Sequence, residues 1–268
     1  MKNILLSASV LIVSLGCDAV MAADAPAIPK TAQAAQAKPV RVLAFSKTNG
    51  YRHGPQIALA HAMLADMAQK GELAVDKNSG EDPAAFTDAV LKNVDVVVFL
   101  HTIDDPQHPL FDQAQRAAFE SFIKRGGGCV GLHASSAVGA DWPFYGEMMG
   151  AHFMTHSPIQ AADLQVVNGN HPATAHLPDV FRHDDEWYVF DANIHGKPGF
   201  DELLKVDEKT YAPGAATMKD DHPIAWTHVY AGGRCFYTAI GHTEREYSRP
   251  WFRQHILGGI RWAAGRDK

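Results

Sequence analysis

The chain has 268 residues, 46% of them hydrophobic and 20% charged, which is the composition of an ordinary soluble globular protein. A chain of this length can bury a sizeable core without disulfides or structural metals. Its formal net charge is -6, and it contains no basic run and no nucleic-acid-binding motif. DNA, RNA and anionic membrane surfaces are therefore not expected as partners.

The N-terminal segment has the features of an export signal. Lys2 precedes an almost wholly apolar run that ends at Leu15, and small residues follow, so we predict a signal peptide over residues 1–22. The apolar run is too short for a transmembrane helix. We expect an exported, periplasmic protein without a transmembrane span. A lipoprotein anchored at Cys17 is the weaker alternative, because Ser14 fits the start of a lipobox poorly.

The rest of the chain is expected to form one domain. Residues 23–39 are rich in Ala, Pro, Gln and Lys and predict a flexible linker. Residues 40–268 show no internal repeat and no second domain boundary. Cys129 and Cys235 lie in apolar, strand-like runs, which indicates two separate buried thiols rather than a disulfide.

The first half of this domain alternates strands and helices. Apolar runs predict strands at 40–45, 94–100 and 129–132, and helical spacing predicts a helix at 56–70 and another that begins after Asp112. The β-α-β-α-β order predicts an α/β fold with a doubly wound, mostly parallel sheet of the flavodoxin-like kind.

The pattern changes between residues 151 and 223. Short strand-like pieces, separated by Asn, Gly, Pro and His, predict inserted antiparallel hairpins packed beside the main sheet (164–167, 187–190 and 202–206). The α/β pattern then returns with two strands and a final helix (224–228, 234–240 and 251–264).

Polar residues follow each predicted parallel strand. Ligands of open parallel sheets bind outside the carboxyl ends of the strands. The residues expected at that edge are Asn49, Tyr51, Arg52, His53, His101, Asp104, Asp105, His133, Ser135, Ser136, His242, Glu244 and Arg245. The sequence thus predicts a histidine-rich site, although His53 could instead cap its helix and His101 could only bind its own loop.

His133 has the most informative position. It lies at the apex of Gly131-Leu132-His133-Ala134-Ser135, which has the outline of a nucleophile elbow. A hydrolase of that type needs Ser or Cys at the apex, and Ser135 lies beyond it. A neutral imidazole there suits an acid-base, electrophilic or metal-ligand role.

The segment from Arg182 to Tyr188 contains a histidine, three carboxylates and two aromatic residues. It is either a solvated turn or a wall of the site with a platform for a sugar ring. Strand alternation places Asp184, Glu186 and Tyr188 on one face and Asp185 and Trp187 on the other. Only one of these sets can face the site.

The metal signal is weak in the sequence. His152 and His156 have i, i+4 spacing, but their neighbours predict an extended segment. No Cys pair and no His-Glu-x-x-His motif is present. The cofactor is therefore open, with a divalent metal as one candidate.

Several motifs, taken together, resemble the ThuA-like (trehalose utilisation) family from about Val40 to Gly265. They are Tyr51-Arg52-His53, Arg125 to Ala134, Asp185-Glu186-x-Tyr188, Pro223 to Thr227, Gly233 to His242 and Gly258 to Ala263. The family is similar in fold to class I glutamine amidotransferases, which have Cys at the elbow and a late His-x-Glu. Here His242-Thr243-Glu244 matches the late motif but His133 replaces the Cys, which argues against glutaminase chemistry.

The resemblance implies carbohydrate metabolism, with a small-molecule sugar as the partner and a keto-glycoside as one candidate. We assign catalytic roles to His133, Glu186, His242 and Glu244. We assign substrate binding to Tyr51, Arg52, His53, Trp142, His156, Asp185 and Tyr188. The alternatives are a non-catalytic sugar-binding protein and a metal-dependent hydrolase of another ester or amide. A homo-oligomer is compatible with the sequence.

Overall fold

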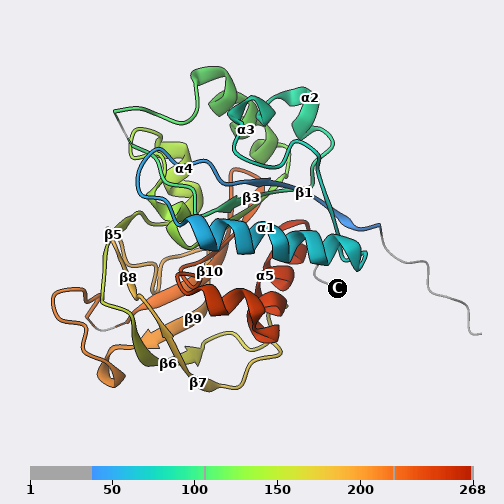
Figure 1. Ribbon diagram of the computed structural model, residues 1–268. Coiled ribbons are helices and arrows are strands. Elements are labelled where there is room, and N and C mark those ends of the chain that lie inside the picture. The colour runs from blue at the N-terminus through green and yellow to red at the C-terminus, as the bar shows by residue number, and fades with distance from the viewer. Residues whose placement is uncertain (1–37, 106, 220, 267–268) are drawn as a thin grey trace, which may run out of the picture. The chain divides into compact units, whose positions relative to one another are not determined.

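The computed structural model describes residues 38–105, 107–219 and 221–266 (Figure 1). The signal peptide predicted at 1–22 lies outside the described residues, as does the linker apart from Lys38 and Pro39. None of the described helices is both long and apolar enough to span a membrane.

The described residues form a nine-stranded sheet in which seven strands run in one direction. Its order is β2 (Leu73–Val75), β1 (Val40–Phe45), β3 (Val96–Leu100), β4 (Gly128–Leu132), β11 (Gly233–Thr238), β10 (Pro223–Tyr230), β9 (Phe200–Asp207), β6 (Gln160–Val166) and β7 (Val180–Asp185). The first five strands pair in parallel. The next four pairings are antiparallel, so β10 and β6 are the two reversed strands.

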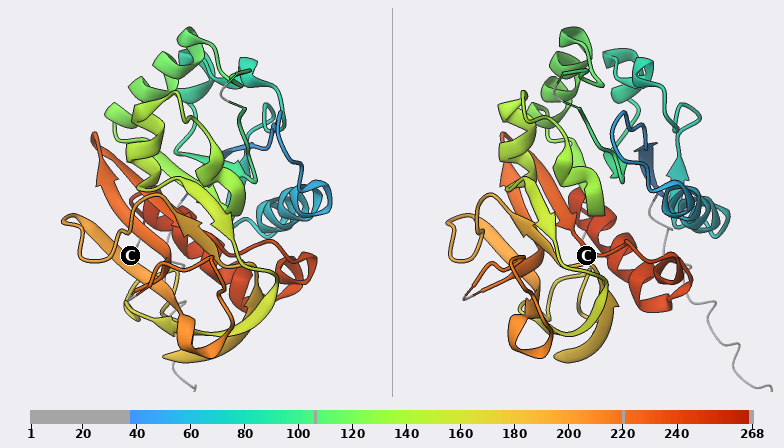
Figure 2. Two further views of the ribbon diagram at one scale, coloured as in Figure 1. Left: turned by 90° about the vertical axis from the view of Figure 1, so that its left-hand side faces the viewer. Right: turned by 60° about the vertical axis from the view of Figure 1, so that its left-hand side comes forward.

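Helices cover both faces of the sheet, as the doubly wound prediction requires. They are α1 (Gly54–Gln69), α2 (Asp88–Leu91), α3 (Gln113–Lys124), α4 (Pro143–Met149) and α5 (Pro250–Ala263). In Figure 2, α1 and α5 lie on one side of the sheet and α3 and α4 on the other. Short 3₁₀ turns occur at η1 (Pro83–Ala85), η2 (His133–Ala137), η3 (Glu208–Thr210) and η4 (Glu244–Ser248).

Local chemistry explains these elements. All residues of β3 and β4 are buried, because parallel strands are covered by helices on both faces. Asp112 and Gln115 form a reciprocal capping box at the start of α3. As predicted, Cys129 and Cys235 are separate buried thiols, opposite each other in β4 and β11.

The predicted position of the hairpins is wrong in one respect. Strands β9, β6 and β7 do not pack beside the main sheet but extend it, because β9 pairs along the free edge of β10. An uncovered edge would leave its backbone N–H and C=O groups without partners. Only β5 (Phe153–His156) and β8 (Tyr188–Phe190) form a separate two-stranded sheet.

Glycines let α5 approach the rest of the domain closely, which gives a testable prediction. A Cβ on Gly258 would lie 2.3 Å from the backbone oxygen of Pro172. We expect Gly258→Ala to lower the free energy of unfolding by about 1–3 kcal/mol, despite the higher helix propensity of Ala. Urea denaturation measures this.

The matched control is Gly54→Ala in the first turn of α1, where an added Cβ meets no atom within 4 Å. It should change stability by less than about 0.5 kcal/mol. Equal stability of the two variants would contradict the close packing of α5.

Candidate functional site

Four histidines meet at the carboxyl ends of the parallel strands. His53, His101, His133 and His242 follow β1, β3, β4 and β11. The ring centroid of His53 lies 5.1 Å from those of His101 and His133 and 5.3 Å from that of His242. This is the edge where open α/β sheets bind ligands. His53 precedes α1 but its side chain does not cap the helix.

The backbone is strained at two of these histidines. His101 has φ 53° and His133 has φ 51°, in the left-handed region that non-glycine residues seldom adopt. His133 therefore occupies a sharp strand-to-turn elbow, as its sequence context predicts. Such strain persists only where surrounding contacts impose it, and it is concentrated at functional sites.

The hydrogen bonds of His133 define the state of its ring. Its Nδ1 lies 2.6 Å from the carbonyl oxygen of Ala239, which can only accept, so Nδ1 carries a proton. Burial lowers the pKa of His133, which favours the neutral ring. Nε2 is then the lone-pair nitrogen, and the hydroxyl of Tyr188 donates to it at 2.8 Å.

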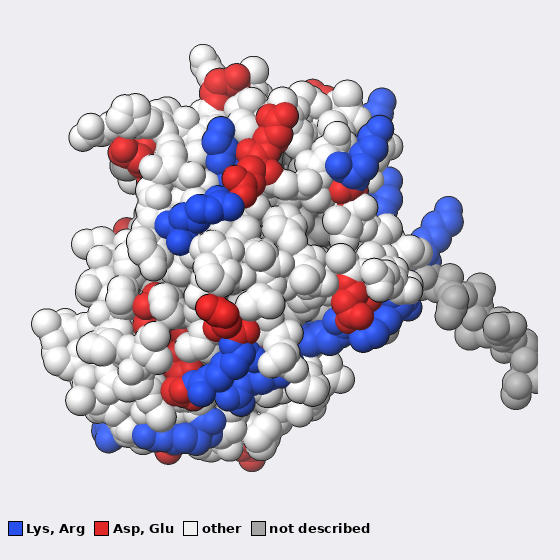
Figure 3. Space-filling model, in the orientation of Figure 1, with Lys and Arg blue, Asp and Glu red and all other residues white. Residues whose placement is uncertain are grey.

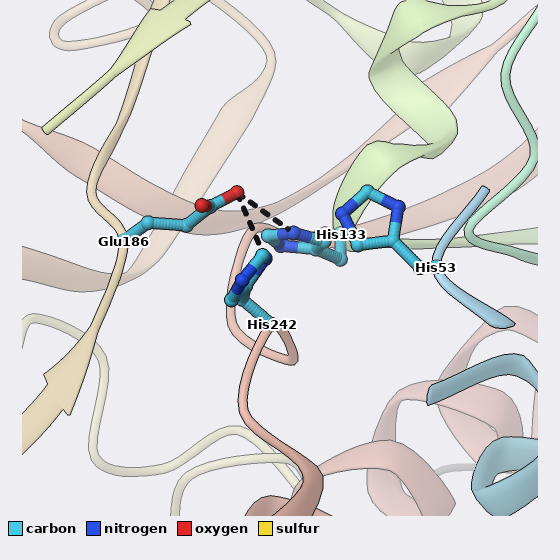
Figure 4. Close-up of side chains that lie close together, drawn as sticks. All are labelled: His53, His133, Glu186 and His242. Atoms are coloured by element: carbon cyan, nitrogen blue, oxygen red, sulfur yellow. Dashed lines mark ion pairs between the residues drawn. The ribbon is translucent and has the colours of Figure 1, made fainter. Parts of the chain in front are cut away.

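Glu186 contacts three histidines, and Figure 4 draws its ion pairs with two of them, His133 and His242. Its Oε1 is 3.2 Å from Nε2 of His133 and 3.1 Å from Nδ1 of His242, and its Oε2 is 3.3 Å from Nδ1 of His156. Burial opposes ionisation of Glu186, but its close contacts with His133 and His242 prevail and hold its pKa well below the usual range. The nearby carboxylate of Glu186 raises the pKa of His242.

This geometry suits a shared cation. With Nδ1 of His133 protonated, the Nε2 lone pair faces the ionised Glu186 oxygen at 3.2 Å, and a cation between these two acceptors, either a proton or a metal ion, removes their repulsion. Burial also lowers the pKa of His53 to about 3, so its ring is neutral. Among the described residues, the buried Nδ1 atoms of His53 and His242 have no hydrogen-bond partner.

The donor set fits a divalent transition metal. One ligand atom each from His53, His133, Glu186 and His242 lies within 4.8 Å of all the others. Tetrahedral ligands at about 2.1 Å from an ion are roughly 3.4 Å apart, so modest side-chain movement closes the cluster. The hydrogen bond from His133 Nδ1 to the backbone carbonyl of Ala239 fixes the orientation of the ring, as such hydrogen bonds usually do for metal-ligating histidines.

A second group, His195, Glu202 and Asp221, is better explained by ion pairing. The two ring nitrogens of His195 each face a different carboxylate, 2.8 Å from Glu202 and 3.4 Å from Asp221. Lys205 also pairs with Asp221 at 2.9 Å. Each of the two acids thus already has a partner of its own.

The cluster opens into a pocket of about 570 Å³. Its lining consists of Tyr51, His53, Ile103, Ala134, Ala137, Phe153, His156, Ile159, Glu186, Tyr188 and His242. On the face of the protein shown in Figure 3, acidic and basic side chains are interspersed.

Most of the residues predicted for the site come together there. Tyr51, His53, His156, Glu186, Tyr188 and His242 line the pocket, and His133 contacts Glu186 and Tyr188. As strand alternation predicts, Glu186 and Tyr188 share a side. Asp184 instead pairs with Arg245.

Asp185 is a buried residue that holds two backbone segments of the site together. It is fully buried; its Oδ2 accepts from the backbone N–H of Gly241 at 2.8 Å, and its Oδ1 accepts from the N–H of Glu186 at 2.9 Å. It thus links the segments that carry Glu186 and His242. The structure corrects its predicted contact with substrate to a supporting position.

Three other predicted residues lie away from the pocket. Arg52 is half-exposed and pairs with Glu81 at 2.5 Å. Trp142 is buried, and its indole N–H donates to Glu120 at 3.0 Å. Glu244 is exposed at the start of η4, because this tight turn directs Glu246 into the core instead. None of the three lines the pocket.

The His152–His156 pair is also separated. A Cβ on Gly146 would lie 2.1 Å from Nε2 of His152, so this ring packs against α4 while His156 lines the pocket. Three further pocket residues are not evident from the sequence: Phe153, Ile103 and Ile159. Apolar residues beside a strand end carry no signal that distinguishes them from core.

Tyr247 is a further residue that the sequence did not reveal. Its hydroxyl donates to the Gly241 carbonyl at 2.9 Å and lies 2.5 Å from Nε2 of His101. Because the Tyr247 hydroxyl proton is already donated to Gly241, the hydrogen bond with His101 requires Nε2 of His101 to be the donor. His101 thus reaches beyond its own loop and braces the segment before His242.

Residues 41–263 match the family model described as ThuA, trehalose utilisation. A solved thua-like protein from Bacteroides uniformis is 24% identical, with a TM-score of 0.71 over 89% of this chain and 96% of that one. Another from Parabacteroides merdae is 20% identical, with a TM-score of 0.66 over 85% and 90%. PurLQS from Thermotoga maritima is 13% identical, with a TM-score of 0.53 over 84% and 99%. No curated protein matches significantly.

These likenesses confirm the fold expected from the sequence motifs, which is ThuA-like and similar to that of class I glutamine amidotransferases. At such identities the solved structures inform the fold alone.

The supporting position of Asp185 predicts a pH effect. Burial raises its pKa to about 7, above the value of about 3.9 in an unfolded chain. Between these values the folded state binds more protons, so this group's contribution to stability is present below pH 4 and falls as pH rises to 7. In the Asp185→Asn variant the side chain cannot ionise, so this variant should lose the part of the pH dependence of stability that comes from Asp185.

Urea denaturation of the metal-free protein at pH 4.5, 5.5 and 6.5 measures the effect. The slopes of unfolding free energy against pH should differ by up to about 1.4 kcal/mol per pH unit. Asp163→Asn, at a partly exposed position of β6, is the control and should keep the wild-type slope. Identical slopes in all three proteins would contradict a protonated Asp185.

Proposed function

The chain belongs to the ThuA family, described as trehalose utilisation, and from that premise we propose an enzyme that acts on a carbohydrate by metal-assisted proton transfer. Family membership supports the role in carbohydrate utilisation. The observation that supports metal assistance is the facing pair of acceptors, His133 Nε2 and the Glu186 carboxylate, inside a set of four potential ligands.

His53, His133, Glu186 and His242 would hold the ion. Three imidazoles and one carboxylate suit Zn²⁺ and other first-row divalent ions better than Mg²⁺ or Ca²⁺, which prefer oxygen ligands. When bound, the ion supplies positive charge to an oxyanion that develops on the substrate.

His156 is then the best-placed base. Glu186 and His242, to which the sequence assigns catalytic roles, are both ligands in this arrangement. His156 lines the pocket, and its Nδ1 donates to the carbonyl of Ser157 at 2.9 Å, which leaves Nε2 with the lone pair in the neutral ring. Glu186, 3.3 Å from the same Nδ1, stabilises the ring once it has gained a proton.

A keto-glycoside is the substrate that this chemistry suits. Its ketone acidifies the adjacent C–H bond, from which His156 removes the proton, and the electron pair moves to the carbonyl oxygen as an enolate. The enolate re-forms the ketone while a C=C bond forms to the anomeric carbon. The anomeric bond to the glycosidic oxygen breaks, and that oxygen takes up a proton from His156.

A metal-dependent hydrolase of another ester or amide is the second candidate. It requires His133 and two further histidines to converge, and His53 and His242 meet that condition. A purely sugar-binding protein is less well supported, since it would not need the displaced pKa values of His53 and Glu186.

We also propose that the enzyme is exported to the periplasm, on the strength of the sequence of residues 1–22. Export would place it where external glycosides arrive. N-terminal sequencing of the mature protein tests this, and a chain that retains Met1 in the cytoplasm would rule it out.

Metal content is the first functional prediction. The purified protein should contain about one equivalent of a divalent transition metal, and chelation should lower its melting temperature, because the ion binds the folded state. His133→Ala should lose the metal. His195→Ala, in the exposed second group, is the matched control and should retain it. If only the His195→Ala variant lost the metal, the metal site would have to be assigned to His195, Glu202 and Asp221 instead.

Turnover gives the next prediction. His156→Gln should lower kcat for a 3-keto-glucoside by about 10²–10⁴-fold, the usual contribution of a general base, while metal content stays unchanged. Thr155→Ala, on the exposed side of β5, is the control. Release of the aglycone, followed by chromatography, is the assay. A His156→Gln enzyme with wild-type kcat would remove the base assignment.

A further inference from the structure

The pocket is lined by two chemically different kinds of side chain. Its ionisable groups form one continuous cluster, since Glu186 contacts His156 and His242 and the ring of His53 packs on that of His242. The rest of the lining that the structure describes is aliphatic or aromatic: Tyr51, Ile103, Ala134, Ala137, Phe153, Ile159 and Tyr188. Apart from the two tyrosine hydroxyls, this part offers no polar side chain.

This division limits what the pocket can bind. A sugar ring carries several hydroxyl groups, and each one buried without a partner costs about 1–3 kcal/mol. The ionisable cluster can serve one sugar ring. A second ring of a disaccharide would bring its hydroxyls against Ile103, Phe153 and Ile159. The side chains of these residues have no group that can form a hydrogen bond with a hydroxyl.

The apolar part continues to the surface. The side chains of Tyr51 and Ile159 line the pocket, yet these residues are 69% and 53% exposed. Phe153 packs on Tyr188 with ring centroids 4.3 Å apart, so an aromatic wall lies next to the cluster. Apolar side chains at the mouth of a pocket favour an apolar group of the ligand.

We propose that the substrate is a glycoside with an aromatic or similarly apolar aglycone, with its single sugar ring at the histidine cluster and its aglycone against Ile103, Phe153 and Ile159. This inference rests on the proposed carbohydrate function and specifies its substrate class. It departs from the disaccharide that the family description names.

Isothermal titration calorimetry on the purified, metal-containing protein tests the proposal. The probes are phenyl and methyl glucosides of the same anomer, for both anomers, together with trehalose and p-cresol. The phenyl glucoside of at least one anomer should bind about tenfold or more tightly than its methyl counterpart, because the phenyl ring buries apolar area. It should also bind more tightly than trehalose.

Two surface variants localise the effect. Ile159→Asn should reduce the preference for phenyl over methyl to less than about threefold, because it places an amide where the aglycone lies. Met154→Asn is the matched control: Met154 is 63% exposed on neighbouring β5 but does not line the pocket, so this variant should keep the preference. Both residues are exposed, and circular dichroism checks that both variants are folded.

The outcomes separate the two proposals. Equal affinity for phenyl and methyl glucosides, tighter binding of trehalose, or an unchanged preference in Ile159→Asn would overturn the apolar aglycone and leave the carbohydrate function standing. Binding of p-cresol without binding of any glycoside would overturn the carbohydrate function and this inference together. Binding of no probe would also overturn this inference.

Discussion

The parallel pairing of β4 with β11 is the constraint on which the site depends. It places the elbow of His133 beside the end of β11, so that His133 Nδ1 can donate to Ala239 and Nε2 turns toward Glu186. The same pairing brings His242 to the same oxygen of that carboxylate. A shift in this register would separate the two imidazoles and remove the backbone partner that sets the tautomer of His133.

The elbow also shows how one residue redirects the chemistry of a shared backbone shape. A positive φ at the end of β4 projects the side chain above the sheet edge, as a nucleophile elbow does. With His133 there, one ring nitrogen is committed to a backbone carbonyl and the other to the pocket. This arrangement orients a lone pair and is not that of a nucleophile activated by a neighbouring base.

Much of the site could be predicted because parallel strands end together. His53, His133 and His242 each follow a strand that apolar runs identify, and alternation places Glu186 with Tyr188. Trp142 and Glu244 could not be placed, since the direction of a side chain depends on tertiary partners such as Glu120 and on the 3₁₀ turn at η4. The hairpins were misplaced because sequence alone does not show which sheet edge a strand joins.

The small β5–β8 sheet stands apart from the nine-stranded one, yet it provides Phe153, His156 and Tyr188 to the pocket. The ends of β1, β4 and β11 provide the other histidines from the main sheet. The pocket is therefore assembled from two modules with separate backbone hydrogen bonding. Substitutions at outer positions of the small module can change which molecules are admitted while the ladder beneath the histidines is left intact, so this architecture allows ligand preference to diverge between relatives that retain the same reactive centre.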